Sequence, residues 1–242
     1  LSVWAAYMYI VFFSNGILPG ADLLQFETRT WEEVLNLSLN FFLVAPALNL
    51  PLSPVVHPIL EGVFNLLLSW AAMFAGFFSD DRKDKPNLLP MLPVVIGMQF
   101  LTSAFLLPYL TTRTTETRDD VTREDLTRVS QVGESRWLGP AMATVGSYSI
   151  AWAFVGRFAD FGELSERWAT FLDLMSIDRV GVSFLVDLVI FGLFQAWLVD
   201  DDLKRRGVAA DELPQLRAIG KYMPFFGMAA YLALRPTYQS LE

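Results

Sequence analysis

Apolar stretches about as long as a bilayer is thick recur along this chain. Residues 55–78 read VVHPILEGVFNLLLSWAAMFAGFF, and residues 88–110 read LLPMLPVVIGMQFLTSAFLLPYL. A helix needs about 20 mostly apolar residues to cross the hydrocarbon core. The candidate segments are 1–17, 34–50, 55–78, 88–110, 138–155, 180–199 and 219–234. They predict an all-α fold, a polytopic transmembrane helical bundle of 6–7 spans that forms one integral membrane domain over residues 1–242.

The span count depends on the segment 34–50, which is interrupted by Asn36, Asn40 and Pro46. It is either a full span or a re-entrant or interfacial helix, and the pattern leaves both open. A short Pro51-Leu52-Ser53-Pro54 turn joins it to the next span, which favours a helical hairpin.

Polar connections divide the apolar segments. Residues 111–136 carry Val121, Leu126, Val129 and Val132 at roughly helical spacing. This spacing predicts an amphipathic helix on the solvent side, which lies either on the bundle or on a neighbouring protein. Residues 200–217 contain the sequence DDDLKRRG and form a second polar connection. Between residues 161 and 177, charged and apolar residues alternate in a pattern typical of an interfacial helix.

Composition excludes several classes of function. Hydrophobic residues make up 53% of the chain and charged residues only 18%, against about a quarter in soluble domains. The formal charge of -8 disfavours nucleic acid as a partner, because phosphate binding requires a basic patch. The chain has no Cys and a single His, so it supplies no thiolate ligand for haem or an iron–sulfur cluster, and no multi-histidine metal site.

The first candidate site is the series His57, Glu61 and Asn65, which a helix would stack along one face. An imidazole, a carboxylate and an amide in a column can relay protons or ligate a metal, including the magnesium of a chlorophyll. The structural alternative is that Pro58 opens a helix, with His57 as its N-cap and Glu61 complementing the helix dipole.

A second candidate is Asp187, which lies about 12 Å along its predicted helix at 1.5 Å per residue. A carboxylate at that depth costs on the order of 3 kcal/mol and needs a partner. We expect Asn65, Gln99 or Tyr148 to provide it. Gln195 follows two turns later on the same face, so the pair indicates either a proton or substrate path or an interhelical hydrogen bond.

Small residues recur at every fourth position in one apolar segment. They are Gly139, Ala143, Ser147 and Ala151. Such a ridge lets another helix approach closely, so it predicts helix packing and carries no information about catalysis.

Two segments resemble multi-span membrane proteins of cyanobacteria and plastids that have no assigned chemistry. They are VDLVIFGLFQAWLVDDDLKRRG at 186–207 and HPILEGVFNLLLSWAAMFAGFFSDDR at 57–82. The resemblance implies a thylakoid membrane, where accessory subunits bind chlorophyll a and carotenoid. The sequence Gly156-Arg157-Phe158-Ala159 matches only the end of the light-harvesting pigment motif, because Trp152 stands where a glutamate is required. Pigments would need other ligands, for which the candidates are His57, Glu61, Asn65, Gln99 and Gln195.

No sequence motif of a known catalytic site is present. The first hypothesis is therefore a non-catalytic accessory or linker subunit of a photosystem, packed against other membrane subunits and holding pigments or lipids. The alternative is a small membrane enzyme or carrier for a lipid or isoprenoid, using Glu61, Asn65 and Asp187. A third possibility is an assembly factor that binds its client transiently.

Overall fold

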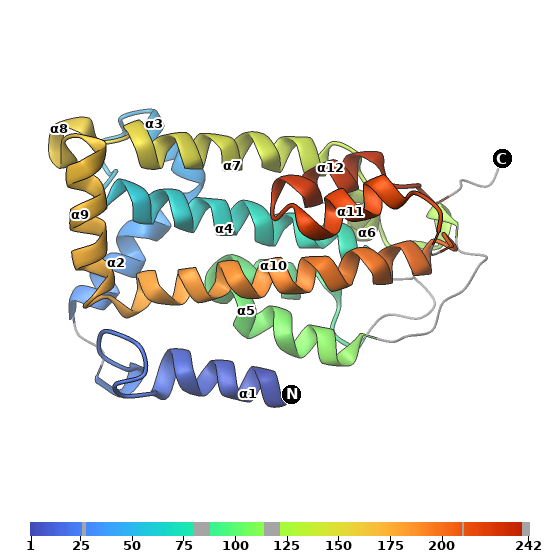
Figure 1. Ribbon diagram of the computed structural model, residues 1–242, viewed down its shortest axis with the longest axis horizontal. Helices are drawn as coiled ribbons and strands as arrows, with labels where there is room; N and C mark the ends of the chain where they lie inside the picture. The colour runs from blue at the N-terminus through green and yellow to red at the C-terminus, as the bar shows by residue number, and fades with distance from the viewer. Residues whose placement is uncertain (26–27, 80–87, 114–121, 210, 239–242) are drawn as a thin grey trace. The chain divides into compact units, whose positions relative to one another are not determined.

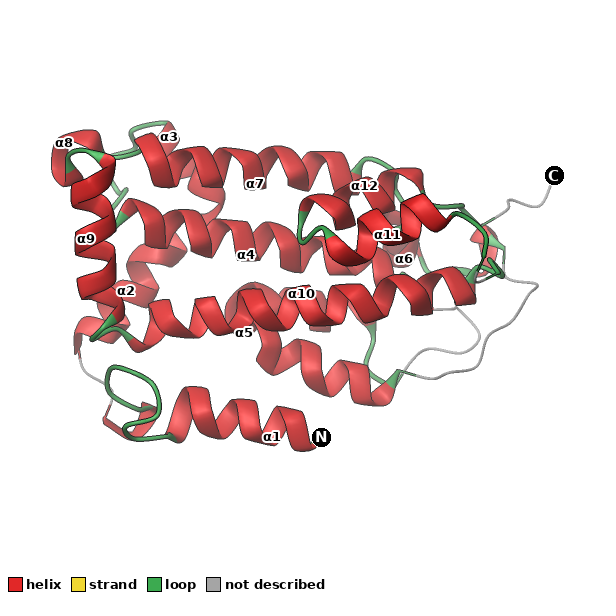
Figure 2. Ribbon diagram, viewed as in Figure 1, coloured by secondary structure: helices red, strands yellow, loops and turns green. Residues whose placement is uncertain are grey.

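The computed structural model describes residues 1–25, 28–79, 88–113, 122–209 and 211–238. Within these ranges the regular structure is helical and contains no strand, as Figure 2 shows. The predicted all-α fold is therefore confirmed for the described part of the chain.

Four helices are long and apolar enough to cross a membrane. They are α4 (Pro58–Phe77), α5 (Met91–Thr112), α7 (Leu138–Val155) and α10 (Arg179–Arg205). We refer to them as the membrane-length helices. Each begins within a few residues of a predicted segment, so four of those segments are confirmed as long helices. The count of 6–7 spans is not confirmed, since the described residues contain four helices of this kind.

The N-terminal segment is shorter than a bilayer. Helix α1 (Ser2–Met8) continues into a π-helical turn over Tyr9–Phe13, and together they form a short apolar helix.

The segment 34–50 is not a continuous span. Helix α2 (Thr28–Leu39) ends before Asn40, and a 3₁₀ turn (Phe41–Leu43) and the one-turn helix α3 (Val44–Ala47) follow. Phe42 and Leu43 adopt positive φ angles of 52° and 57°, which reverse the chain. The side chain of Asn40 holds this break by donating to the backbone oxygen of Pro54 at 3.0 Å. A full span here is therefore wrong, because the polar residue stabilises a turn.

The segment 219–234 is also broken. Helices α11 (Pro214–Tyr222) and α12 (Phe226–Leu234) form a helical hairpin, seen in Figure 1, whose turn contains Pro224. Phe225 has a φ angle of 59° at the reversal. Neither helix is long enough to cross the hydrocarbon core, since each has 9 residues.

The two polar connections differ from their predictions. Helix α10 continues through Asp200–Arg205, so this part of the second connection is helical. In the first, a 3₁₀ turn (Arg123–Asp125) precedes the short helix α6 (Arg128–Gly133). Leu126 is buried, but Val129 and Val132 are exposed, so the described residues do not cover the predicted apolar face. Val121 lies outside the described residues.

The chain divides into two compact units. Unit 1 comprises residues 1–69 and 145–188, and unit 2 comprises residues 70–144 and 189–242.

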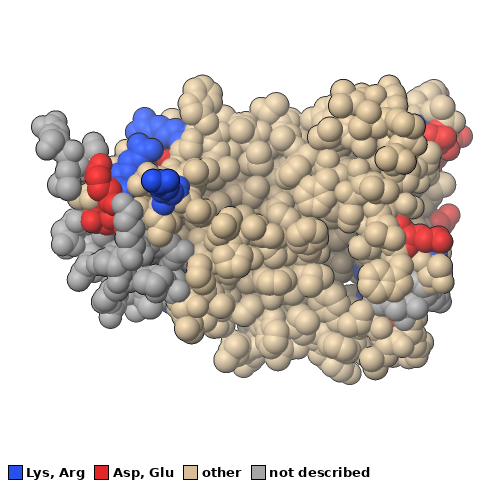
Figure 3. All heavy atoms as spheres, turned by 180° about the vertical axis from the view of Figure 1, so that it is seen from behind, with Lys and Arg blue, Asp and Glu red and all other residues tan. Residues whose placement is uncertain are grey.

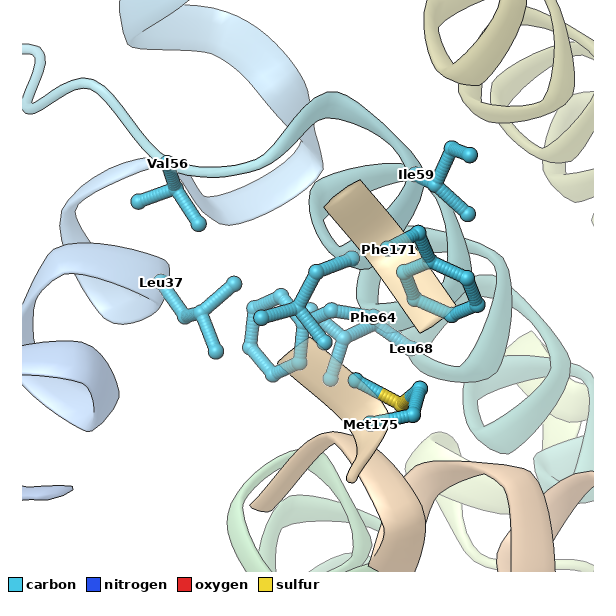
Figure 4. Packing of buried hydrophobic residues seen from close by; sticks show 8 residues of the cluster. Leu37, Val56, Ile59, Phe64, Leu68, Phe171 and Met175 are labelled. Carbon is cyan, nitrogen blue, oxygen red and sulfur yellow. The ribbon is translucent and has the colours of Figure 1, made fainter. Parts of the chain in front are cut away.

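The core of unit 1 is a cluster of aliphatic and aromatic side chains around the first half of α4. Figure 4 shows Leu37 of α2 facing Phe64 and Leu68 of α4, with Phe171 and Met175 of α9 closing the other side. Burial of such side chains stabilises by about 1.5–3 kcal/mol each. This cluster therefore fixes α2 and α9 against α4.

Helix α9 (Leu164–Met175) follows the single turn α8 (Phe158–Phe161) and confirms the helix predicted within residues 161–177. Figure 1 shows α9 running across the ends of α4 and α10 rather than along them. Its inner face buries Phe171 and Met175. Its exposed apolar residues are Leu164, Trp168 and Leu172.

Unit 2 has an aromatic core. The ring of Phe74 on α4 packs against that of Phe191 on α10, with centroids 5.0 Å apart and an interplanar angle of 60°. The ring centroids of Phe78 and of Tyr109 on α5 are 4.2 Å apart. Such pairs add about 0.5–1.5 kcal/mol beyond area burial. Figure 3 shows that most of the drawn face is formed by residues other than Lys, Arg, Asp and Glu.

Candidate functional site

A carboxylate with several hydrogen-bond partners in unit 1 is that of Glu61, on the first turn of α4. Glu61 is fully buried. Its Oε2 accepts hydrogen bonds from Nε of Arg157 at 2.8 Å and from Nε1 of Trp152 at 2.8 Å. Its Oε1 accepts from Nη2 of Arg157 at 2.9 Å and from Nδ2 of Asn40. The carboxylate therefore accepts four hydrogen bonds from three residues.

The surrounding groups complete the network. Nη2 of Arg157 also donates to the backbone oxygen of Pro54 at 2.7 Å, and Ser53 Oγ donates to Oδ1 of Asn40 at 3.0 Å. Arg157 follows α7 with a φ angle of 48°, and its guanidinium lies 5.8 Å from the ring centre of Trp152. We call Asn40, Ser53, Glu61, Trp152 and Arg157 the Glu61 network.

A close helix contact brings Glu61 and Trp152 together. A Cβ added at Gly62 would lie 2.7 Å from the backbone oxygen of Ser149 and 2.9 Å from Cβ of Ala153. The absence of a side chain at Gly62 thus lets α4 approach α7 within unit 1, in the manner of small residues at membrane helix contacts.

His57 takes the N-cap position predicted for it. Helix α4 begins at Pro58, and the Ile59 backbone N–H donates to Nδ1 of His57 at 3.3 Å. The other ring nitrogen, Nε2, lies 3.1 Å from Oγ1 of Thr170, and the ring packs edge-on against Phe161. Burial lowers the pKa of His57 to about 4, and the nearby charge of Arg167 acts in the same direction.

Asn65 is buried one turn beyond Glu61. Its Nδ2 donates to the backbone oxygen of Glu61 at 2.9 Å, whereas Oδ1 has no hydrogen-bond partner among the described residues. His57, Glu61 and Asn65 are thus all buried, but His57 and Glu61 have separate partners. The structure does not bring the three side chains together around one point.

Asp187 is buried in unit 1, and its Oδ1 accepts a hydrogen bond from the hydroxyl of Tyr7 at 3.1 Å. Tyr7 lies on α1 and was not among the three expected partners. The sequence signal was available, since Tyr7 is a hydroxyl-bearing side chain within the first apolar segment.

Gln195 lies in unit 2, where its amide serves the hairpin of α11 and α12. Its Nε2 donates to the backbone oxygens of Gly220 at 2.6 Å and Met223 at 3.1 Å. Its Oε1 accepts from Trp70 Nε1 at 3.0 Å and from the Phe225 backbone N–H at 3.2 Å. All four positions of this amide are used by protein groups. Its role as a pigment ligand stays a prediction.

Gln99 is the opposite case. It lies on α5, and both polar atoms of its side chain are buried without a hydrogen-bond partner among the described residues. It is the least satisfied amide of the predicted ligand set.

The four residues of the predicted small-residue ridge on α7 differ in how deeply they are buried. A Cβ at Gly139 would lie 2.2 Å from the backbone oxygen of Ala229, so α7 and α12 touch there within unit 2. Ala143 is half-buried, and Ser147 and Ala151 are exposed. Ser149 and Ala153, which contact Gly62, form a second small-residue face that was missed.

Unit 2 contains an ionic network that the sequence pattern did not reveal. Arg206 donates to Asp202 at 2.9 Å and to both carboxylate oxygens of Glu134 at 2.7 and 2.9 Å. Arg235 also donates to Asp202 at 3.0 Å and to Glu134 at 2.9 Å. The hydroxyl of Tyr231 donates to Asp202 at 2.6 Å. We call Glu134, Asp202, Arg206, Tyr231 and Arg235 the Asp202 network.

A pair of acidic side chains lies at the start of α10. The oxygens of Asp178 accept the backbone N–H groups of Gly181 at 2.7 Å and Val180 at 3.2 Å, which caps the helix. Burial raises the pKa of Glu33 on α2 to about 8, and a hydrogen bond to Asp178 together with its negative charge adds to the increase.

The described residues contain no group of three or more His, Cys, Asp or Glu side chains that could hold a metal ion. Comparison with known proteins found no matching family model, no matching curated protein and no matching solved structure.

Proposed function

We propose that the protein is a non-catalytic, membrane-embedded accessory subunit of a larger membrane assembly. The observation that carries this proposal is the saturation of Glu61. A general base or a proton relay needs a free lone pair near its substrate, whereas this carboxylate accepts four hydrogen bonds from protein groups. Such a group holds α4 and α7 together.

The Asp202 network supports the same interpretation. Two carboxylates and two guanidinium groups neutralise one another inside unit 2, and the Tyr231 hydroxyl donates a hydrogen bond to Asp202. Buried charges are retained only when they are paired and hydrogen-bonded. They fix the C-terminal segment and α6 against α10.

The membrane setting rests on the four membrane-length helices and on their exposed apolar residues. Phe100 of α5 is 68% exposed, and Leu193 of α10 is 67% exposed. Lipid or a neighbouring subunit would cover these side chains. In this setting α9 lies at the bilayer surface, with Trp168 at the level of the headgroups.

The finer part of the proposal is a photosynthetic membrane. It rests on the resemblance of segments 57–82 and 186–207 to cyanobacterial and plastid membrane proteins. The subunit would associate with a photosystem in the thylakoid and hold chlorophyll a, carotenoid or lipid. Asn65 and Gln99 are the ligand candidates with the best geometry, because each has buried polar atoms without a partner.

The test is native purification of the tagged protein from thylakoid membranes in mild detergent. We expect a complex in which other membrane subunits are present in fixed stoichiometry, with a chlorophyll or carotenoid absorption spectrum. A protein that migrates alone and colourless contradicts the proposal. Co-migration in substoichiometric amounts would instead identify an assembly factor.

A second candidate is a membrane enzyme or carrier for a lipid or isoprenoid. The observation in its favour is Oδ1 of Asn65, a buried acceptor without a partner near Glu61. An Asn65→Leu variant separates the two functions. Under the enzyme or carrier hypothesis it abolishes turnover or transport in proteoliposomes, whereas an accessory subunit keeps its association with the complex.

A further inference from the structure

Helix α5 is broken in the middle of its apolar sequence. Leu101 has φ and ψ angles of -133° and 34°, and Thr102 has 24° and -106°, so two helical halves meet at these residues. The bend is sharp, because a Cβ at Gly97 would lie 2.3 Å from the ring of Phe105. In a straight helix, residues eight apart are separated by about 12 Å along the axis.

Two polar side chains flank this break and have no partners among the described residues. They are Gln99, whose Oε1 and Nε2 are both buried, and Ser103, which is fully buried. Two buried serines of other membrane-length helices donate to the carbonyl four residues earlier: Ser69 to Asn65 and Ser149 to Val145, both at 2.8 Å. The break at Leu101 and Thr102 prevents the corresponding hydrogen bond from the Ser103 hydroxyl to the backbone oxygen of Gln99.

Orphaned polar atoms in a membrane-length helix indicate a missing partner, since buried polar groups are normally hydrogen-bonded. We propose that the break in α5 binds the hydroxyl group of a lipid-soluble alcohol between Gln99 and Ser103. The inference extends the lipid-holding part of the proposed function and rests on it for the membrane setting.

The unpaired donor and acceptor atoms of the Gln99 amide indicate that the ligand group is a hydroxyl. Oε1 of Gln99 needs a donor and Nε2 needs an acceptor, and a hydroxyl supplies both. An ether or a ketone would leave Oε1 unpaired. Helix α5 contains no Lys, Arg, Asp or Glu, so a charged headgroup has no counter-ion on it.

The apolar part of the ligand would lie along α5. Three apolar residues within three positions of Gln99 are exposed: Ile96 by 50%, Phe100 by 68% and Leu101 by 46%. Gln99 as a whole is half-buried, although its two polar atoms are not exposed. A bound alcohol would keep its chain in the hydrocarbon while its hydroxyl is held at the break.

The experiment measures equilibrium binding to the whole chain in phosphatidylcholine nanodiscs, with radiolabelled farnesol as the probe. Farnesyl methyl ether and farnesene serve as competitors that lack, respectively, the donor and any polar atom. We expect saturable farnesol binding that neither competitor displaces. Gln99→Leu and Ser103→Ala should each weaken it by about tenfold, the effect of one lost hydrogen bond.

Matched controls are Gln215→Leu on α11 and Ser147→Ala on α7, both at exposed positions, and neither should change binding. If Gln99→Leu does not fold, Gln99→Asn and Ser103→Ala carry the test. Equal competition by farnesene, or unchanged affinity in the Ser103→Ala and Gln99 variants, overturns the proposal. Binding is measured on the isolated chain, so its failure is distinct from failure to co-purify with a membrane complex.

Discussion

The guanidinium of Arg157 forms a two-pronged ion pair with Glu61 inside unit 1. Nε lies 2.8 Å from Oε2 and Nη2 lies 2.9 Å from Oε1. This fork geometry is available to Arg and not to Lys, and it joins the end of α7 to the start of α4.

Replacing Arg157 with Met should destabilise the protein by about 3–5 kcal/mol, because Glu61 would remain buried without its counter-ion. The double variant Glu61→Leu, Arg157→Met should be considerably less destabilised, since it removes both charges. Thermal unfolding in detergent micelles, followed by Trp fluorescence, measures both. Arg136→Met is the matched control, because Arg136 is exposed. If the double variant is as unstable as the single one, the ion pair is not the cause.

The sequence was sufficient to predict part of the Glu61 network. The spacing of His57, Glu61 and Asn65 predicted that they share one helix face, and all three are buried in the structure. Pro58 correctly predicted the helix start. Arg157 and Asn40 were not identified as partners, because contacts between residues 96 or 21 positions apart depend on packing that no local pattern encodes. Hydrophobic periodicity indicates which face of a helix is buried, but it does not identify the residues that contact that face.

Helix breaks were predicted less well than helices. The segment 219–234 is apolar throughout most of its length, yet it reverses at Met223–Phe225 because the amide of Gln195 binds the turn. In the segment 34–50 the breaking residue, Asn40, was noticed, but its stabilising partners at Pro54 and Glu61 were not. Tertiary hydrogen bonds therefore overrode apolar composition in both segments.

Arg235→Met should release the C-terminal segment of unit 2. Arg235 is 2% exposed and donates to Asp202 and Glu134, so its removal leaves both carboxylates with one cation fewer. We expect a loss of about 3–5 kcal/mol and faster proteolysis after α12. Lys204→Met is the control, since Lys204 is an exposed cation on α10 and should change stability by less than about 0.5 kcal/mol. Equal protease sensitivity of the two variants would contradict the assigned role of Arg235.

Stability should fall as the pH rises from 6.5 to 8. Glu33 has a folded-state pKa of about 8, against 4.5 as its ordinary value, so in this range the unfolded chain has lost the proton that the folded protein keeps. The facing groups are Asp178, which raises the pKa, and Arg29, which lowers it. Glu33→Gln should abolish this fall in melting temperature. A variant that retains the wild-type pH profile would exclude Glu33 as its origin.

His57 has the opposite effect at lower pH. Its folded-state pKa of about 4 lies below the ordinary 6.5, so the unfolded chain binds a proton first and stability is lost as the pH falls from 6.5 to 4. Glu33 opposes this trend above pH 4.5, and the test therefore uses the Glu33→Gln background. Adding His57→Asn, which preserves an N-cap, should reduce the fall in melting temperature between pH 6.5 and pH 4. If the melting temperature still falls by the same amount, groups other than His57 cause the loss of stability.

Two glycines on membrane-length helices should respond to alanine in opposite directions. A Cβ at Gly62 would lie 2.7 Å from the backbone oxygen of Ser149, so Gly62→Ala forces α4 and α7 apart and should cost about 1–3 kcal/mol. A Cβ at Gly192 would meet only Trp70, at 3.9 Å, so Gly192→Ala should gain up to about 1 kcal/mol from helix propensity. Melting temperatures of the two variants in the same detergent check the sign. If Gly62→Ala stabilises the protein as Gly192→Ala does, then α4 and α7 are not in close contact at Gly62, and the position of Glu61 beside Trp152 loses its structural basis.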